Sequence, residues 1–289
     1  MKRSWNVQEL LAWTKDYFTS QNIAEPRLEA EVLLASALGI DRMGLYVNHD
    51  RPVNEEERAE FREFVRRRAK GEPTAYITRS REFMSLPFYV DERVLVPRPD
   101  TETLVEESVR LLKGFDGPTL AADIGTGSGA IAVSIAKYVP DTQVFAVDIS
   151  EPSLEVARQN AATNGVDSQI VFLQGNLLEP LPPNGFHLLA ANLPYIRSAE
   201  MPTLQIEVRD HEPHNALVGG DDGLDWYRLL MPQALAVLVD GGYLLMEIGD
   251  REQADMLVQE AGSGWIDRYF LADLAGRERV VVLKKGGLA

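Results

Sequence analysis

A glycine-rich turn between an apolar strand and an apolar helix is the feature that most restricts the fold of this chain. The turn is Asp123-Ile124-Gly125-Thr126-Gly127-Ser128-Gly129, between a strand expected at 119–123 and a helix expected at 129–138. Glycines in such a turn let backbone N–H groups approach a ligand, and the start of the helix favours a negative group. The arrangement predicts a parallel α/β sheet that binds a nucleoside cofactor.

The segments after this turn continue the alternation of strands and helices. We expect strands at about 143–147, 169–173, 187–191, 242–247 and 278–284, and helices at about 151–164, 225–238 and 251–261. Such a pattern is typical of a mostly parallel sheet that helices cover on both faces. Ligands bind at the carboxyl ends of the strands in such sheets, so Gly125, Asp148, Asn176 and Asn192 should face one crevice.

The glycine spacing alone does not choose the cofactor. Gly125, Gly127 and Ala130 also fit the dinucleotide pattern G-x-G-x-x-A, so a nicotinamide oxidoreductase is one alternative. Asp123 favours a cofactor with an amino-acid moiety, because its carboxylate would attract an ammonium and repel a pyrophosphate. Asp148 ends the next strand, where a carboxylate would bind ribose hydroxyls.

A second motif, Asn192-Leu193-Pro194-Tyr195, follows the strand expected at 187–191. The Asn192 side-chain oxygen and the Leu193 carbonyl can each accept one N–H of a substrate NH2 group. These two hydrogen bonds would orient the nitrogen lone pair toward an electrophile, and the Tyr195 ring would form an aromatic wall of the substrate site. The motif predicts alkylation of an amino or amide nitrogen. The alternatives are a strand that ends in a simple turn and, for Tyr195, a core aromatic residue.

Together the two motifs resemble methyltransferases that use S-adenosyl-L-methionine, and in particular the amino-methylating branch with an Asn-Pro-Pro-Tyr motif. Leu193 stands at the second position here. It keeps the backbone carbonyl but lacks the fixed φ of proline, so packing must hold it. Asn-Leu-Pro-Tyr also looks like the form in adenine-dimethylating enzymes of ribosomal RNA, so an adenine amino methyltransferase acting on RNA or DNA stays open.

The surrounding sequence closely resembles the release-factor glutamine methyltransferases (PrmC/HemK family) over nearly the whole chain. The matching segments are 82–90, 94–106, 207–208, 212–213, 216–224, 241–249 and 273–280. The resemblance implies a Rossmann-like, seven-stranded class I methyltransferase domain after a small helical domain and a β-hairpin linker. It also implies methyl transfer from S-adenosyl-L-methionine to the side-chain amide of the glutamine in the Gly-Gly-Gln motif of translation release factors.

The resemblance assigns roles to residues of both motifs. The cofactor-binding residues would be Asp123, Gly125, Thr126, Gly127, Ser128, Gly129, Asp148, Ile149, Asn176, Leu177 and Asn192. The catalytic and substrate-binding residues would be Asn192, Leu193, Pro194 and Tyr195. Asn176 would accept from the adenine amino group, with Leu177 against the ring, although Asn176 could instead cap its own loop. The segment around Arg98 would close over the cofactor. A cofactor-binding module without catalysis is a further alternative, since Leu193 and Asn176 depart from the usual pattern.

Composition favours a protein substrate. The 289 residues include 29 Lys+Arg and 44 Asp+Glu, a formal net charge of −15, and phosphate backbones repel such a chain. We therefore expect no direct contact with nucleic acid. The absence of cysteine excludes disulfides and favours a reducing compartment. No signal peptide or long apolar span is evident. We expect a cytoplasmic monomer without membrane contact and without a metal, and structural roles for His211 and His214.

The predicted domains are a helical substrate-docking domain over 1–72, a β-hairpin linker over 73–92 and the methyltransferase domain over 93–289. Asn6 and Asn54 are expected to cap helices, and Gly39 is expected to end one. Residues 75–78 and 82–90 are expected to form the hairpin. The basic cluster Arg66-Arg67-Arg68 is either the solvated end of a helix or a docking patch for the release factor.

Overall fold

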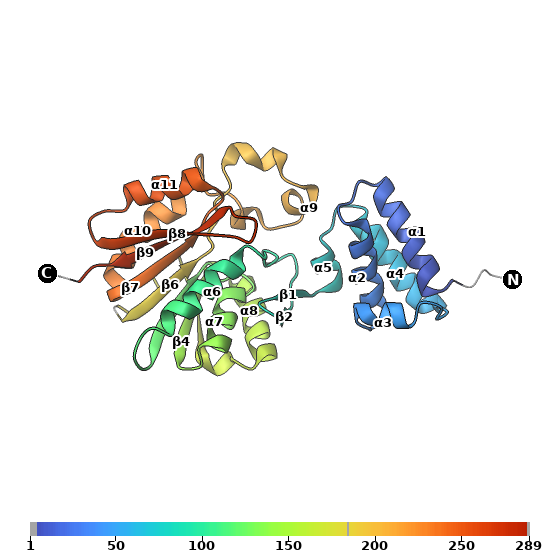
Figure 1. Cartoon of the computed structure of the whole chain (residues 1–289), viewed down its shortest axis with the longest axis horizontal. Coiled ribbons are helices and arrows are strands. Elements are labelled where there is room, and N and C mark those ends of the chain that lie inside the picture. The colour runs from blue at the N-terminus through green and yellow to red at the C-terminus, as the bar shows by residue number, and fades with distance from the viewer. Residues whose placement is uncertain (1–4, 184, 288–289) are drawn as a thin grey trace. The chain divides into compact units, whose positions relative to one another are not determined.

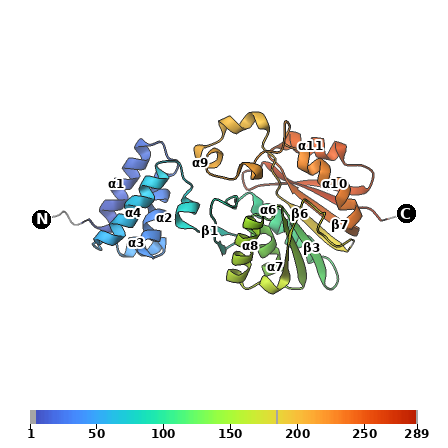
Figure 2. The same ribbon diagram turned by 180° about the vertical axis from the view of Figure 1, so that it is seen from behind.

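The computed structural model describes residues 5–183 and 185–287 and divides into two compact units. The first comprises Met1–Arg79 and Gln205–His211, and the second comprises Ser80–Leu204 and Glu212–Ala289. The predicted domain limits after residues 72 and 92 stay a prediction, and residues 1–4 and 288–289 at the outer ends lie outside the described residues. Figures 1 and 2 show the elements of each unit from two sides.

The first unit is helical. Its helices are α1 (Val7–Ser20), α2 (Pro26–Leu38), α3 (Arg42–Val47), α4 (Glu55–Arg68), α5 (Thr74–Thr78) and α9 (Ile206–Arg209). The predicted caps are confirmed at Asn6 and Asn54, whose side chains each form a capping box with a glutamate three residues on. Gly39 ends α2 with a φ of 62°. Apolar side chains of α1, α2 and α4 form one core.

The expected strand over 75–78 is wrong, because these residues lie in helix α5. Pro73 precedes the helix, and its carbonyl accepts the N–H groups of Tyr76 and Ile77 at 3.0 and 3.1 Å. Both side chains are buried. Tertiary packing therefore outweighs the strand preference of aromatic and β-branched residues here.

A short hairpin follows in the second unit, formed by β1 (Arg81–Phe83) and β2 (Leu86–Phe88). Its connection is Met84-Ser85, and both residues have positive φ, 50° and 56°. A two-residue turn of this hand matches the twist of the paired strands. The predicted hairpin therefore exists, with bounds shifted away from 75–78.

The second unit contains a seven-stranded sheet in the order β5-β4-β3-β6-β7-β9-β8. Its strands are β3 (Thr119–Ile124), β4 (Thr142–Asp148), β5 (Ile170–Gln174), β6 (Phe186–Ala191), β7 (Leu238–Glu247), β8 (Trp265–Ala272) and β9 (Glu278–Lys285). The first five in the sheet order run parallel, and β9 pairs antiparallel with β7 and β8. The expected fold class is confirmed, and β8 is an additional strand that the sequence pattern did not predict.

Helices cover both faces of this sheet (Figures 1 and 2). One face carries α6 (Thr101–Leu112), α7 (Ala130–Tyr138) and α8 (Glu151–Asn164), and the other carries α10 (Asp225–Val237) and α11 (Arg251–Glu260). Neighbouring strand residues alternate between the two cores, as Leu188 and Leu189 of β6 do. This alternation follows from the period of two along a strand. Within the described residues there are also three short 3-10 helices, Asp167–Gln169, Ser198–Thr203 and His214–Ala216.

The strand order reverses beside β3. The chain runs outward from β3 through β4 to β5, and then returns to β6 on the other side of β3. A crevice forms outside the carboxyl ends of strands at such a switch point. Both sequence motifs follow strands of this pair, since the glycine-rich turn follows β3 and Asn192 follows β6. None of the helices in the described residues is long and apolar enough to cross a membrane.

Candidate active site

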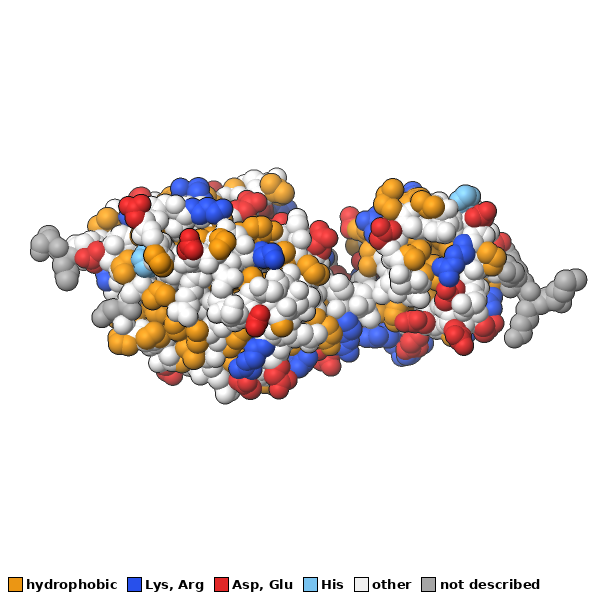
Figure 3. Space-filling model, turned by 90° about the horizontal axis from the view of Figure 1, so that it is seen from below, with side chains coloured by type: hydrophobic (Ala, Val, Ile, Leu, Met, Phe, Trp, Pro, Cys, Tyr) orange, Lys and Arg blue, Asp and Glu red, His pale blue; other side chains and the backbone are white. Residues whose placement is uncertain are grey.

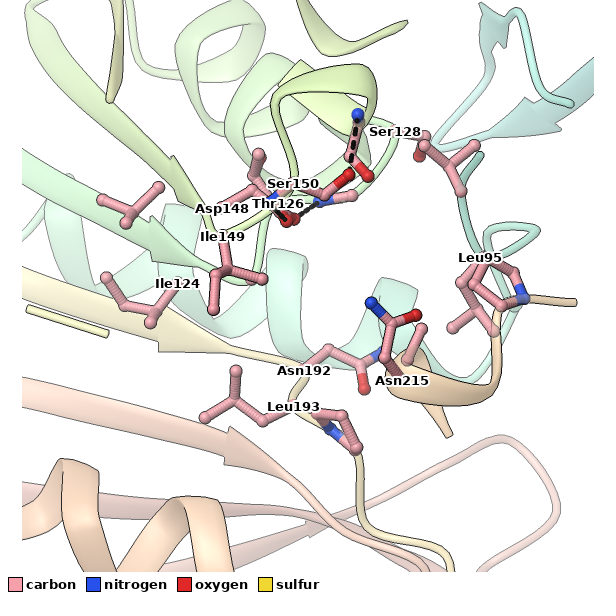
Figure 4. A pocket seen from close by; sticks show the side chains of 18 of the residues that line it. Leu95, Ile124, Thr126, Ser128, Asp148, Ile149, Ser150, Asn192, Leu193 and Asn215 are labelled. Carbon is pink, nitrogen blue, oxygen red and sulfur yellow. Dashed lines mark hydrogen bonds between the residues drawn. The ribbon is translucent and has the colours of Figure 1, made fainter. Parts of the chain in front are cut away.

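A cavity of about 330 Å3 lies at the carboxyl ends of β3, β4 and β6 (Figure 4). Figure 4 shows Thr126, Asp148 and Ser150 on one side of it and Asn192 and Asn215 on the other. The volume suits a small organic ligand, and the wall combines apolar surface with a few polar groups. The predicted site residues on this wall are Gly125, Thr126, Gly127, Ser128, Asp148, Ile149, Asn176, Leu177, Asn192, Leu193 and Pro194.

The glycine-rich turn is held by backbone hydrogen bonds to the neighbouring strand. The N–H groups of Gly125 and Thr126 both donate to the Val147 carbonyl at 2.9 Å. Gly125 has a φ of 74°, and a Cβ on it would lie 2.9 Å from Cδ2 of Leu193. A side chain at this position would be strained by the positive φ and would displace the Leu193 side chain where the turn touches the second motif.

Asp148 fixes the turn and also faces the cavity. Its Oδ2 accepts the Gly127 N–H and its Oδ1 accepts the Ser150 N–H, both at 2.9 Å. Burial raises the pKa of this carboxyl above its ordinary value, and the hydrogen bonds from backbone N–H groups oppose that shift. The carboxylate has a fixed direction, as the predicted contact with ribose hydroxyls requires.

Asp123 lies beneath the turn and is absent from the cavity wall. Its Oδ2 accepts the Thr126 hydroxyl at 2.6 Å and the Ala132 N–H at 3.0 Å. Its Oδ1 has no hydrogen-bond partner among the described residues, and burial raises its pKa to about 7. Asp123 thus supports the turn through its Oδ2 and does not line the cavity, and its contact with the cofactor ammonium stays a prediction.

Gly129 and Tyr195 are also off the cavity wall. Gly129 has a φ of 80°, and a Cβ on it would lie 3.0 Å from the Cβ of Ala157, so it lets α7 approach α8. Tyr195 packs against the core, and its ring lies 3.3 Å from where a Cβ on Gly249 would be. Tyr195 thus lies half-buried against the core and does not line this cavity, and its role as a substrate wall stays a prediction.

The Asn192 amide has a defined orientation. Its Nδ2 donates to the Thr101 hydroxyl at 3.1 Å, which leaves Oδ1 as the end that can accept from a ligand. Asn192 and Thr101 both line the cavity. The structure therefore presents the side-chain acceptor that the sequence motif predicts.

Leu193 is held by a hydrogen bond that a proline could not form. Its backbone N–H donates to the Tyr227 hydroxyl at 3.1 Å, and that hydroxyl donates to the Glu247 carbonyl. Tyr227 is fully buried in α10, and the Leu193 side chain is buried as well. Packing and this hydrogen bond together hold the backbone where the fixed φ of proline is missing.

A buried carboxyl group, Glu247 at the end of β7, lies beside the motif. The Tyr195 hydroxyl donates to its Oε1 at 3.2 Å. Burial raises the pKa of Glu247 to about 7, while nearby Thr101 and the hydrogen bond from Tyr195 act in the opposite direction. Burial also raises the pKa of the Tyr195 phenol, so the hydroxyl keeps its proton and acts as a donor.

Several wall residues were not among the predicted site residues. They are Glu92, Arg93, Val94, Leu95, Pro97, Arg98, Thr101, Ile124, Ala130, Ile131, Val147, Ser150, Ser153, Gly175, Pro213, Asn215, Ala216 and Trp226. The segment around Arg98 was expected to close over the cofactor, and it does line the cavity. Arg98 donates to both carboxylate oxygens of buried Glu212 at 2.7 Å. The resemblance over 94–106, 212–213 and 216–224 was an available signal for Val94, Leu95, Pro97, Arg98, Thr101, Pro213 and Ala216. The other residues of this set, Trp226 among them, lie outside those segments.

The chain is similar to known proteins over most of its length. Residues 9–78 match the family model of the PrmC N-terminal domain, and residues 119–263 match a methyltransferase domain. The release factor glutamine methyltransferase of Geobacter sulfurreducens is 44% identical over 279 residues, which is 96% of each chain. That of Rhodopirellula baltica is 42% identical over 286 residues, 97% of each chain. The chain belongs to the release factor glutamine methyltransferase family.

The membership confirms the predicted class of enzyme, a methyltransferase that uses S-adenosyl-L-methionine. The solved catalytic domain of hMettl16, in complex with MAT2A 3'UTR hairpin 6, has a TM-score of 0.58 and 14% identity. That likeness covers 75% of this chain and 81% of the other and shows the shared fold alone.

The cavity residues fit this cofactor. Asp148 offers a carboxylate for ribose hydroxyls, and Asn176 offers an amide in the same cavity wall. Ile149 lines the cavity, yet its side chain is 62% exposed. This apolar surface could pack against a planar group such as an adenine ring. Leu177 adopts a φ of 50° in the same wall. These residues would hold the nucleoside.

Proposed function

We propose that this enzyme methylates the side-chain amide nitrogen of the glutamine in the Gly-Gly-Gln motif of translation release factors. The relatives over the full length are named for release factor glutamine methylation. The observation that carries the proposal is the oriented Asn192 amide, whose oxygen is left for a ligand because its nitrogen is bonded to Thr101. A carboxamide NH2 needs two acceptors, and the Leu193 carbonyl is the second.

The Leu193 carbonyl remains able to accept from a substrate. The Tyr227 hydroxyl is 3.5 Å from it, at the limit of a hydrogen bond, and is much closer to the Glu247 carbonyl. The backbone at Leu193 is fixed through its own N–H. Its carbonyl direction is therefore set before a substrate arrives, which lowers the entropic cost of orienting the amide.

An amide nitrogen is a weak nucleophile, because its lone pair is delocalised into the carbonyl. S-adenosyl-L-methionine supplies an electrophilic methyl group on a sulfonium. Asn192 and the Leu193 carbonyl favour a geometry with weaker delocalisation, and they stabilise the positive charge that develops on the nitrogen. No strong base is required before transfer, since the nitrogen proton becomes acidic only as that charge develops.

Charge supports a protein substrate over nucleic acid. The formal net charge is −15, and Figure 3 shows acidic and basic side chains interspersed on the face that it draws. The basic cluster is neutralised within its own unit. Arg66 pairs with Glu63, Arg67 pairs with Glu72, and the buried Arg68 pairs with Glu29 and Glu207. These ion pairs favour a structural role for the cluster over a docking patch.

The test is incubation with labelled methyl donor and a release factor, wild type beside one whose loop glutamine is changed to alanine. We expect label in the wild-type factor alone. Transfer to RNA or DNA in preference to the release factor would instead establish the adenine amino methyltransferase. Cofactor binding without any transfer would establish the non-catalytic module. The absence of cysteine supports a cytoplasmic location, and the monomeric state stays a prediction for light scattering to test.

A further inference from the structure

The Leu193 carbonyl is the second acceptor for the substrate amide, and its direction depends on the backbone on both sides of it. The near side is held by the hydrogen bond from the Leu193 N–H to the Tyr227 hydroxyl at 3.1 Å. On the far side, the ring of Pro194 fixes its own φ and restricts the backbone of the residue before it. A second anchor just after Pro194 would therefore leave the carbonyl little freedom to turn.

Gln253 of α11 supplies an anchor at this place. Its Nε2 donates to the Tyr195 carbonyl at 2.8 Å, although the two residues lie 58 positions apart in the chain. The same nitrogen donates to the Asp222 carbonyl at 2.9 Å, and Oε1 accepts the Gly249 N–H at 2.8 Å. Both protons and the oxygen of the amide are thus engaged. Gln253 is 0% exposed, so water does not compete for these bonds.

We propose that Gln253 is a positioning residue for the methyl transfer, which holds the backbone at Tyr195 and so keeps the Leu193 carbonyl directed toward the substrate NH2 group. The inference rests on the proposed function. Gln253 does not line the cavity, so it acts through the motif and not on the substrate. Its three hydrogen bonds join the segments that follow β6 and β7 to the loop that precedes α10.

That loop packs directly against the same stretch of backbone. A Cβ on Gly219 would overlap the Pro194 carbonyl oxygen. Gly223 has a φ of 81°, and a Cβ on it would overlap both the Tyr195 carbonyl oxygen and Nε2 of Gln253. Glycine at these two positions therefore allows the loop to approach the motif and the hydrogen bond that Gln253 makes.

The start of α11, which carries Gln253, is fixed as well. Asp250 caps the helix, and its Oδ1 accepts the Gln253 N–H at 2.9 Å. Its Oδ2 accepts from Arg197, two residues after Tyr195, at 2.6 Å. This ion pair is partly exposed and contributes less than the buried amide does. The helix and the end of the motif are nevertheless joined at two points.

The test compares Gln253→Met, which keeps the length of the side chain and removes its amide, with Asn164→Leu as the matched control. Asn164 ends α8, is 7% exposed, and donates to the carbonyls of Pro87 and Asn160 at 3.0 and 2.9 Å. Each variant therefore removes a buried amide that donates to two backbone carbonyls. Both should lower the urea midpoint of unfolding by similar amounts.

We expect Gln253→Met to lower kcat roughly tenfold to hundredfold, because a small misplacement of a group at the reacting centre has effects of this size. KM for the release factor and the affinity for S-adenosyl-L-homocysteine should change by less than about threefold. Asn164→Leu should keep kcat near that of the wild type. A folded Gln253→Met enzyme with the kcat of the control would overturn the proposal.

Gly223→Ala is a second variant, which displaces the Tyr195 carbonyl and keeps the Gln253 side chain. Gly117→Ala is its control, because Gly117 also has a φ of 81° and a Cβ on it would meet nothing within 4 Å. The backbone strains both alanines, but only the one at position 223 reaches the hydrogen bond. We expect kcat to fall in Gly223→Ala alone. Equal kcat in the two variants would contradict the anchor.

A crystal structure of the wild type with S-adenosyl-L-homocysteine and a Gly-Gly-Gln peptide needs no variant to fold. We expect the substrate NH2 at the Leu193 carbonyl and the Gln253 amide at the Tyr195 carbonyl. A Gln253 amide separated from that carbonyl would overturn the proposal. A wild-type enzyme without transfer to any release factor would refute the proposed function, whereas full transfer by a folded Gln253→Met enzyme would refute this inference alone.

Discussion

The glycine-rich turn and the Asn192–Tyr195 motif follow neighbouring strands, and each has a buried carboxyl group beside it. Asp123 lies under the turn, and Glu247 lies beside the motif. Burial raises the pKa of each to about 7. Each keeps one carboxylate oxygen without a hydrogen-bond partner in the part of the chain that the structure describes. Two parts of one site thus each contain a buried carboxyl group whose incomplete hydrogen bonding lowers the stability of the fold.

The partners of the two groups differ in their distance along the chain. Asp123 is bonded to Thr126 and Ala132, three and nine residues on. Glu247 accepts from Tyr195, 52 residues away, and Asn192 donates to Thr101 across 91 residues. The cofactor turn is therefore a local structure, whereas the substrate acceptor is assembled from α6, β6, β7 and α10. This difference predicts separate effects on cofactor binding and on methyl transfer.

The largest expected effect is that of Asn192→Ala, which should separate the two regions. Removal of one preorganised group that stabilises developing charge costs roughly 10²–10³ in kcat. The affinity for S-adenosyl-L-homocysteine should stay within about threefold, because the turn and Asp148 are untouched. Steady-state kinetics with a release factor, together with calorimetry of the cofactor product, check both. Turnover near that of the wild type would contradict the assignment of methyl transfer to the Asn192 motif and of cofactor binding to the turn.

The next prediction concerns stability and pH. The pKa of Glu247 is raised from 4.5 to about 7 in the folded chain, so the native state binds this proton more tightly than the unfolded state does. Stability should therefore fall as pH rises from about 4.5 to about 7, by about 3 kcal/mol for this group. The contribution of Asp123 to stability should also fall as the pH rises, because its pKa is raised from 3.8 to about 7 in the folded chain.

Urea unfolding of the wild type, Glu247→Gln and Asp123→Asn between pH 5 and pH 8 would measure these contributions. Each variant should gain stability relative to the wild type as the pH rises, because it lacks the group that must ionise. The kinetic effects should differ, with Asp123→Asn acting on cofactor affinity and Glu247→Gln acting on kcat. A pH-independent difference between variant and wild type would show that the carboxyl group does not titrate in this window.

The contrast between local and distant contacts also explains what could be predicted from the sequence. The helix expected at 151–164 coincides with α8, and the strand, turn and helix around Gly125 lie where expected. These elements depend on residues close in sequence. Strand β8 was not predicted because, at the edge of the sheet, only Trp265 of its residues is buried, and Asp267 and Arg268 interrupt its apolar residues. The spacing of Leu104, Ser108 and Leu111 was a usable signal for α6.

The site was predictable only in part for the same reason. The motif identifies Asn192, but nothing near it in the sequence indicates that Thr101 orients its amide. Tyr195 follows Asn192 directly, which suggested a substrate wall, yet its hydroxyl meets Glu247 and its ring packs on the core. The direction of a side chain after a strand depends on tertiary contacts, so adjacency in sequence did not locate it.

A pair of glycine variants should show where the two regions touch. Gly125→Ala and Gly129→Ala both introduce a Cβ at positive φ, which should cost about 1–3 kcal/mol of stability each. The Cβ meets Leu193 in the first variant and Ala157 of α8 in the second. We expect Gly125→Ala to lower both cofactor affinity and kcat, and Gly129→Ala to act mainly on stability. Equal kinetic losses in the two variants would contradict a contact between turn and motif that matters for function.

The smallest expected effect is that of Tyr227→Phe, which removes the acceptor for the Leu193 N–H and keeps the buried ring. The hydroxyl also donates to the Glu247 carbonyl, so two buried hydrogen bonds are lost. Their loss should cost about 2 kcal/mol of stability, and kcat should fall roughly fivefold if the Leu193 carbonyl shifts. Tyr138→Phe is the control, since its hydroxyl donates to the Met84 carbonyl outside the cavity. If Tyr227→Phe lowers stability alone, packing of the Leu193 side chain is enough to aim its carbonyl. If kcat falls as well, the hydrogen bond through the leucine N–H replaces the rigidity that a proline gives at this position, and the acceptor depends on α10 in addition to α6 and β7.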